Sequence, residues 1–274
     1  MRRALAIRRA RALVLLAACA TASCSLDPWG WLRSTDVDRR FTDNQALDAP
    51  ADITPTLPFS FVVIADTHVQ PASGVEDRFA ALAAKLAPGD RFVLVCGDLV
   101  QNGAASDFTT FKSLAGSLEI PVLTVPGNHD LYNGGWQAYK GVLGTKSMYT
   151  FAAGPVRVIA LDSANGTLGA PQRKWLEETL AAKTEAYCVT FTHFEFFTDT
   201  ITETQAWTDY TEAFSLMHLF ETSGVTIHFS GHSHRLFERT INGTVYCTVP
   251  ALANGRFIRV NVASDGISYT VEQM

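Results

Sequence analysis

Short apolar runs alternate with amphipathic segments along the first half of this chain. Residues 59–64 form an aromatic and β-branched run that is typical of a buried strand. In residues 76–86 the apolar side chains recur at helical spacing, and the pattern stops at a Pro-Gly pair. A strand at 92–95, a helix at 108–118 and a strand at 121–125 continue the alternation. Strands that alternate with helices predict parallel crossover units and an α/β fold.

The second half continues this alternation and then changes character. We expect strands near 148–151, 156–161, 186–192 and 225–230, with helices at about 171–182 and 210–222. Beyond residue 235 two hairpins are expected, because Asn242-Gly243 is a strong two-residue turn signal and a second turn falls at Ser264-Asp265-Gly266. The chain therefore predicts mixed sheets with an antiparallel C-terminal part.

Polar clusters follow the predicted strands at the point where each strand ends. The carboxyl ends of strands in an open α/β sheet are where ligands bind, so these clusters are expected to converge on one edge. Buried polar groups cost free energy unless each finds a partner, so a core would not need such a set. The clusters are Asp66-Thr67-His68, Gly97-Asp98, Gly127-Asn128-His129-Asp130, Thr192-His193 and Gly231-His232-Ser233-His234.

These clusters contain the side chains that metal ions need. Asp66 and His68 are two residues apart, so both can reach one ion from a loop. His232 and His234 have the same spacing and could reach one ion each. Mixed oxygen and nitrogen ligands suit Mn, Fe, Zn, Ni or Co better than Ca or Mg. The pattern favours metal-assisted hydrolysis of a phosphoester.

The five motifs in this order resemble those of the calcineurin-like metallophosphoesterase superfamily, over residues 59–234. The resemblance implies a four-layer αββα sandwich and two transition metal ions, with Mn, Fe or Zn expected. It also implies that a metal-bridging hydroxide attacks phosphorus in line, that His129 contacts the phosphoryl oxygens or protonates the leaving group, and that Asp130 orients the ring of His129. The implied ligands are Asp66, His68 and His234 for the first metal, Asn128, His193 and His232 for the second, and Asp98 as the bridge.

Departures from the family pattern narrow the expected activity. The run Gly97–Gly103 lacks the acidic-basic-glycine continuation of the protein Ser/Thr phosphatases, and Gln101 stands where purple acid phosphatases carry a Tyr ligand. The run is more similar to the branch that includes cyclic-nucleotide phosphodiesterases, so a diester is slightly preferred over a monoester. His193 is followed by Phe194 and Glu195 rather than by the family's His-x-Pro, which makes it the weakest match among the ligands.

The N-terminal residues predict export. Residues 1–23 combine a basic start with a short apolar stretch, as in a secretory signal peptide, and no apolar run reaches the roughly 18 residues of a membrane span. Cys19 and Cys24 each follow small residues, as in a bacterial lipoprotein cleavage box, and either could be lipidated. An ordinary cleaved signal is the alternative.

Residues 24–57 are polar and contain several prolines, which predicts a tether with one short helix before a catalytic domain at 58–274.

The charge balance limits the partners. Without residues 1–23, 17 basic and 27 acidic residues remain, which argues against a nucleic-acid polymer as the partner. A small phosphorylated substrate remains compatible, because two divalent metals would reverse the local charge. A membrane contact is expected only through the lipid anchor. The alternative function is a non-catalytic cell-surface binding protein on the same fold, because fold alone does not guarantee activity.

Several other features have a structural interpretation. Cys96, Cys188 and Cys247 lie in apolar runs and are expected to be buried thiols rather than a disulfide framework. His228 is expected to be a structural histidine. Asp162–Asn165 is expected to be a turn at a strand end, and a position lining the cleft is the alternative. The aromatic segment 194–209 is consistent with either a substrate-facing lid or local packing.

Overall fold

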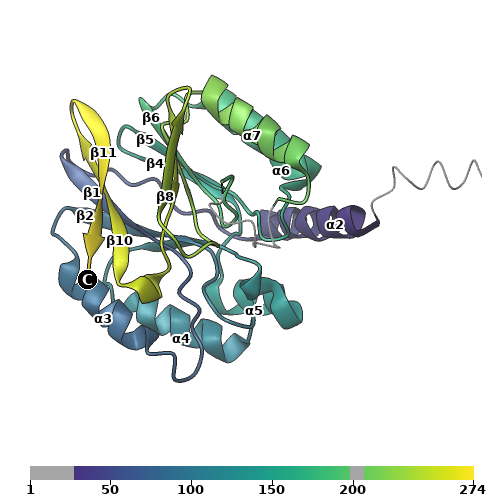
Figure 1. The fold of residues 1–274 in the computed structure, drawn as a ribbon, viewed down its shortest axis with the longest axis horizontal. Coiled ribbons are helices and arrows are strands. Elements are labelled where there is room, and N and C mark those ends of the chain that lie inside the picture. The colour runs from purple at the N-terminus through teal and green to yellow at the C-terminus, as the bar shows by residue number, and fades with distance from the viewer. Residues whose placement is uncertain (1–27, 198–206) are drawn as a thin grey trace, which may run out of the picture.

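The computed structural model describes residues 28–197 and 207–274, and these form two sheets packed face to face with helices on both outer sides (Figure 1). The predicted signal peptide and both candidate lipidation cysteines lie outside the described residues. Among the residues described, no helix is both long enough and apolar enough to span a bilayer.

The first sheet has five strands in the order β11-β10-β1-β2-β3. Its parallel part is β1 (Phe59–Ile64), β2 (Asp90–Cys96) and β3 (Val122–Val125), connected by α3 (Val75–Lys85) and α4 (Ala105–Gly116). The hairpin of β10 (Arg256–Ala263) and β11 (Gly266–Gln273) adds to it, with β10 antiparallel to β1. The C-terminal chain therefore completes the sheet that the N-terminal strands begin.

The second sheet has six strands in the order β4-β5-β6-β7-β9-β8. Its elements are β4 (Tyr149–Ala153), β5 (Val156–Ala160), α6 (Gly169–Ala182), β6 (Tyr187–Phe191), α7 (Tyr210–Thr222), β7 (Ile227–Ser230), β8 (Phe237–Ile241) and β9 (Thr244–Thr248). Strands β5, β6, β7 and β9 are parallel, and the antiparallel strands β4 and β8 lie at the two edges. The predicted mixed sheets are confirmed.

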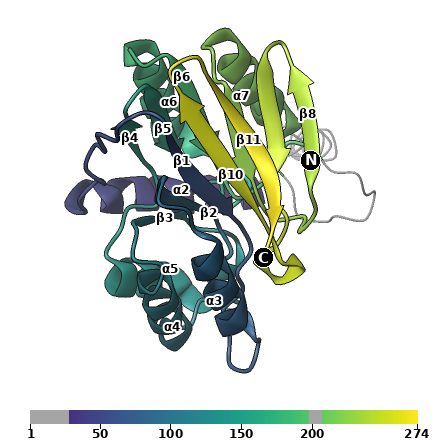
Figure 2. The same ribbon diagram turned by 90° about the vertical axis from the view of Figure 1, so that its left-hand side faces the viewer.

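Three apolar clusters hold the layers together. Between the sheets, the ring of Phe92 stacks on that of Phe61, with centroids 4.6 Å apart. It also packs edge to face against the ring of Phe151 in the second sheet, with centroids 5.5 Å apart. A second cluster packs α3 and α4 on the first sheet, and a third packs α6 and α7 on the second sheet (Figure 2). This order of helix, sheet, sheet and helix is the predicted four-layer sandwich. The three predicted thiols, Cys96, Cys188 and Cys247, are buried and unbonded.

Five short helical segments connect the larger elements in the described part of the chain. They are η1 (Asn44–Ala46), η2 (His129–Gly134), α5 (Gly135–Ala138), η3 (Tyr139–Leu143) and η4 (Leu252–Asn254). Two of them matter for the site, because η2 begins at His129 and η4 lies beside the end of β1, where Ala251 bridges Ala65.

The segment before β1 differs from the expected tether. Helix α2 (Pro28–Asp43) is 16 residues long and packs against α6. Val37 is 1% exposed and Arg40 is 2% exposed. The Nε and Nη2 atoms of Arg40 donate to the Asp162 carboxylate at 2.7 and 2.8 Å. Further on, Ile53 bridges Ala153 at the edge of the second sheet. The described part of this segment is therefore packed onto the domain, because a buried ion pair 122 residues apart in sequence fixes it, and no local pattern shows such a pair.

Candidate metal centre

The predicted ligands meet at one edge of the sandwich. Asp66, Asp98 and Asn128 follow β1, β2 and β3 of the first sheet. His193 follows β6 of the second sheet, and His232 and His234 follow β7. Loops from both sheets thus supply side chains to one place, as the strand-end positions predict.

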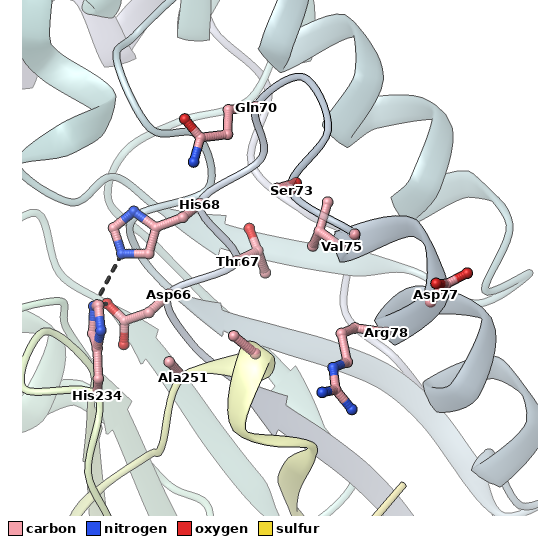
Figure 3. A pocket seen from close by; sticks show the side chains of 12 residues that line it. Asp66, Thr67, His68, Gln70, Ser73, Val75, Asp77, Arg78, His234 and Ala251 are labelled. Atoms are coloured by element: carbon pink, nitrogen blue, oxygen red, sulfur yellow. Dashed lines mark hydrogen bonds and ion pairs between the residues drawn. The ribbon is translucent and has the colours of Figure 1, made fainter.

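The first group of ligands consists of Asp66, His68 and His234, whose ligand atoms lie within 4.8 Å of one another. The Nε2 atoms of His68 and His234 face each other at 3.0 Å, and the Nε2 of His234 lies 3.6 Å from Oδ1 of Asp66 (Figure 3). These three side chains can therefore hold one ion, as the resemblance implies.

The second group consists of Asp98, His193 and His232, which also lie within 4.8 Å. Asn128 joins this group, because its Oδ1 lies 2.9 Å from Nε2 of His193. The Nδ1 of His232 lies 3.2 Å from the same nitrogen. His193 is completely buried at the centre of this group, although its sequence motif is the least typical of the family.

Asp98, a member of the second group, also faces the first group. Its Oδ2 is 3.6 Å from Nε2 of His68 and 3.4 Å from Nε2 of His193. A carboxylate that faces both groups suits the bridging position. His129 forms a third close set with His68 and Asp98, but its Nε2 is 4.0 Å from the Asp98 oxygen.

The hydrogen-bonding roles around His193 indicate a cation. The carbonyl oxygen of Cys96 lies 2.9 Å from its Nδ1 and accepts that proton, so in the neutral ring Nε2 carries only a lone pair. That lone pair faces the oxygens of Asn128 and Asp98, which are also acceptors. Several acceptors converging on one point need a positive centre, which is either a proton on Nε2 or a metal ion, and two imidazoles with carboxylate and amide oxygens suit a transition metal. The residues present therefore fit the implied ions.

Electrostatics in the site follow from burial and close charges. Burial raises the pKa of the Asp66 carboxyl well above its usual range. Burial also opposes ionisation of Asp98, but the surrounding histidines, His193 first, bring its pKa below the usual value. Burial lowers the pKa of His68 to about 4, against the attraction of Asp98, so its ring is neutral and can act as a ligand at neutral pH. Burial would lower the pKa of His193 too, but the Asp98 and Asp66 carboxylates raise it to about 10.

The backbone at the ligands is strained. Asp66, His68, Asp98, His232 and His234 have φ values of 52°, 44°, 50°, 74° and 60°. Non-glycine residues rarely adopt this left-handed region, and such positions cluster at functional sites. These conformations occur directly after the strand ends, where the ligand motifs lie.

Two glycines of the motifs are needed for close approach. A Cβ on Gly127 would lie 2.1 Å from Oδ1 of Asp98, and a Cβ on Gly231 would lie 2.8 Å from Oδ2 of Asp66. Any larger residue would push a carboxylate out of the site. The glycines in Gly-Asn-His-Asp and Gly-His-x-His thus make room for ligands from other loops.

His129 is placed by its neighbours. Its backbone N–H donates to Oδ1 of Asp98 at 2.9 Å, and its ring Nδ1 donates to the carbonyl oxygen of Gln101 at 2.8 Å. The ring lies edge-on to that of His68, with centroids 4.7 Å apart. Nε2 is therefore directed toward the ligand cluster, as a group that contacts a phosphoryl oxygen should be.

Asp130 has a different role from the one expected. Its carboxylate accepts the backbone N–H groups of Leu99, Val100 and Gly127 at 3.1, 2.9 and 2.8 Å, and Gln101, not Asp130, binds the His129 ring. Burial, with repulsion from Asp98, raises the pKa of Asp130 to about 7. The prediction that Asp130 orients the ring is wrong, because the carboxylate instead joins the loops after β2 and β3.

Two residues that support the site were not predicted as part of it. Ser163, at the end of β5, accepts the backbone N–H groups of His193 and Phe194 at 3.1 and 3.0 Å. The Tyr132 hydroxyl accepts from Nδ2 of Asn128 at 3.0 Å, and its ring lies 4.8 Å from that of His129. The strand-end position of Ser163 was a usable signal, but Tyr132 carries none in the sequence.

The remaining sequence predictions concern residues around the site. His228 is buried, with a threonine hydroxyl 2.8 Å from Nδ1, and burial lowers its pKa to about 3, so the structural interpretation holds. Phe196 stacks on Trp207 with centroids 5.0 Å apart, so these two residues of segment 194–209 serve local packing. Residues 198–206 lie outside the described part.

Comparisons with known proteins agree with the fold. A family model described as calcineurin-like phosphoesterase matches residues 59–236. Purple acid phosphatase PPD1 from yellow lupin (Lupinus luteus) seeds superposes with a TM-score of 0.64 at 15% identity, over 80% of this chain and 52% of that one. A dimetal phosphatase from Danio rerio gives 0.64 at 16% identity, over 78% of this chain and 96% of that one.

Two further relatives carry different descriptions. A probable cyclic nucleotide phosphodiesterase from Fibrobacter succinogenes (strain ATCC 19169 / S85) is 27% identical over 104 residues, which are 37% of this chain and 40% of that protein. GAP50 of Plasmodium, described as the anchor in the inner membrane complex, superposes with a TM-score of 0.61 at 14% identity, over 80% of this chain and 85% of that one. The matches to the phosphodiesterase and to the lupin enzyme span less than two thirds of those proteins.

The fold is a sandwich of two mixed sheets, with Asp and His side chains clustered at strand ends in groups that could hold a metal ion. This chain belongs to the calcineurin-like phosphoesterase family, whose model covers well over half of it.

Proposed function

We propose that the chain hydrolyses a small phosphodiester or phosphomonoester at a centre of two transition metal ions, with a diester slightly preferred. The observation that carries the proposal is the convergence of seven ligand side chains from both sheets, with Asp98 facing both ligand groups. Mn, Fe or Zn suits this set of oxygen and nitrogen ligands. When bound, such ions would activate water as the nucleophile and neutralise charge on the phosphoryl oxygens.

The protein's own residues would place the substrate and move a proton. Nε2 of His129 points toward the ligand cluster, while the Gln101 carbonyl holds Nδ1. In that tautomer Nε2 can accept a hydrogen bond, and in the protonated ring it can donate to a phosphoryl oxygen or to the leaving group. The preference for a diester is supported by the run after Asp98 and by the likeness to a probable cyclic nucleotide phosphodiesterase.

Replacing Asp98 by Asn tests the two-metal proposal. Asn would remove the charge that faces both ligand groups, so we expect metal content to fall below two ions per chain and hydrolysis of bis(4-nitrophenyl) phosphate to drop by at least 100-fold. His129→Ala is the contrasting variant, expected to keep both ions and to lose most of the turnover. Elemental analysis and nitrophenolate release measure the two effects. Unchanged metal content and turnover in Asp98→Asn would show that the two-metal proposal is wrong.

The second candidate is a non-catalytic binding protein, and the likeness to GAP50 shows that an anchor can have this fold. The position of His129 beside both ligand groups argues against it, because a binding protein has no need of a proton donor there.

We also propose that the protein is exported and held to a membrane by a lipid on Cys19 or Cys24, since the N-terminal residues resemble a lipoprotein signal. Fatty-acid labelling that persists in both Cys19→Ser and Cys24→Ser variants would contradict this part of the proposal.

A further inference from the structure

A cavity of about 720 Å³ opens beside the first ligand group. Asp66, His68 and His234 form one end of it, and the loop after β1, the start of α3 and η4 form the rest (Figure 3). Pockets that hold drug-sized ligands have volumes of roughly 300–1,000 Å³. The space therefore exceeds what a phosphoryl group alone needs, and it can hold an organic substituent of the substrate.

Arg78 is the single lysine or arginine among the residues that line this cavity. It forms no hydrogen bond or ion pair with another of the residues described here. The guanidinium lies beside Gly255, where a Cβ would be 3.1 Å from its Nη1. An exposed cationic side chain thus borders the cavity without a partner among the described residues.

The start of α3 lies on the same wall, where the helix N-terminus favours an anion and the Glu76 and Asp77 carboxylates of the first turn oppose one. Ser73, Gly74 and Val75 line the cavity at the N-terminus of this 11-residue helix, and no side chain caps it. Unsatisfied N–H groups at a helix N-terminus favour anions. The Asp77 carboxylate also borders the cavity, but Figure 3 shows it pointing away from the metal-ligand end.

We propose that the substituent that enters this cavity carries a second negative charge, and that Arg78 binds it. The proposal rests on the proposed phosphoesterase function, because the scissile phosphate is taken to lie at the ligand groups beside the cavity. The substrate class is then an organic phosphoester with a carboxylate or a further phosphate on its organic group. The metal centre would bind the scissile phosphate and Arg78 would bind the remote charge, so that each end of the substrate has its own binding group.

Matched esters test this directly. The 4-nitrophenyl diesters of butyl phosphate, 3-carboxypropyl phosphate, 3-phosphonopropyl phosphate and 3-aminopropyl phosphate differ only at the end of one chain. The wild-type protein should cleave the carboxylate or the phosphonate ester with a KM roughly fivefold to tenfold below that of the butyl ester, a range typical of one charge-assisted contact near solvent. The two anionic esters show which anion is preferred. Calorimetric Kd values of the butyl and 3-carboxypropyl monophosphate products should differ in the same direction.

Arg78→Gln should abolish this discrimination by raising KM for the anionic esters toward that of the butyl ester. Arg91→Gln is the matched control, because Arg91 is exposed at the start of β2, at the opposite end of the strand from the site, and should leave the KM ratio unchanged. Equal KM values in the wild-type protein, a preference for the amine, or an unchanged ratio in Arg78→Gln would each overturn the inference. If only monoesters are cleaved, phenyl phosphate and 4-carboxyphenyl phosphate replace the diesters, and cleavage of no ester at all would instead refute the proposed function.

Discussion

Tyr132 shows how a side chain outside the predicted ligand set can fix the orientation of one within it. An asparagine amide presents either oxygen or nitrogen, and only the oxygen can bind a metal. The Tyr132 hydroxyl accepts from Nδ2 of Asn128, which leaves Oδ1 directed toward His193. The same logic applies to Gln101, whose carbonyl sets which nitrogen of His129 carries the proton. At the scale of residues, the site depends on hydrogen-bond partners that fix the orientation of the Asn128 amide and the tautomer of His129.

Tyr132→Phe should weaken metal binding at the second ligand group. The change removes one oxygen and keeps the ring beside His129, so the amide of Asn128 loses the bond that sets its orientation. Loss of such a supporting contact typically costs 10–100-fold in metal affinity, and we expect about tenfold. Titration with Mn²⁺ against a chromophoric chelator measures it. Tyr210→Phe, at an exposed position on α7, should leave the affinity unchanged, and equal affinities in all three proteins would remove Tyr132 from the site.

Helix α2 lies before the residues that match the family, yet it is tied to the site by a buried ion pair. Arg40 binds Asp162, and the next residue, Ser163, accepts the backbone N–H of His193. Gln172 on α6 holds the same turn by donating to the carbonyl oxygen of Asp162 at 2.9 Å. At the scale of elements, two helices and a strand end together support the loop that carries a metal ligand.

Arg40→Gln should destabilise the protein strongly. It leaves the Asp162 carboxylate buried without its counter-ion, and breaking such a pair from one side costs about 3–5 kcal/mol. The double variant Arg40→Gln with Asp162→Asn should recover part of the loss, because no charge is then left buried. The free energy of unfolding in urea measures both. Arg39→Gln is the control, since Arg39 pairs with Asp36 at the surface and should change stability by less than about 1 kcal/mol. A small effect of Arg40→Gln would show that α2 is only loosely attached.

At the scale of the whole molecule, the two sheets meet in the apolar core and again at the ligand groups. Asp66 and His68 come from the first sheet and His234 from the second, so an ion bound there would join the layers. Asp98 and His193 make the same connection for the second group. Metal binding is therefore expected to stabilise the sandwich as a unit.

Removal of metal should lower the melting temperature. A ligand present at 1,000 times its Kd stabilises the folded state by about 4 kcal/mol, and each kcal/mol shifts Tm by roughly 2–4 °C for a domain of this size. We expect chelation with EDTA to lower Tm by roughly 8–16 °C in calorimetry, and added Mn²⁺ to restore it. The effect should be much smaller in Asp98→Asn. A Tm that is insensitive to EDTA in the wild-type protein would contradict metal binding between the sheets.

The sequence determined the alternation of strands and helices, the two C-terminal hairpins and the strand-end position of every ligand motif. These features are local, because apolar periodicity and turn residues act over a few positions. The ligand motifs could be read for the same reason, since each is a short run that carries its own polar side chains.

Only the tertiary structure decided how these parts combine. Strands β8 and β9 join one sheet and β10 and β11 the other, although both pairs are hairpins in sequence. The attachment of α2, the partners of Asp130 and the contact of Tyr132 with Asn128 depend on distant residues or on loop geometry. The physical reason is that a hydrogen bond or a buried ion pair is specified by position in space, and residues 30 to 120 positions apart meet only after the sheets have packed.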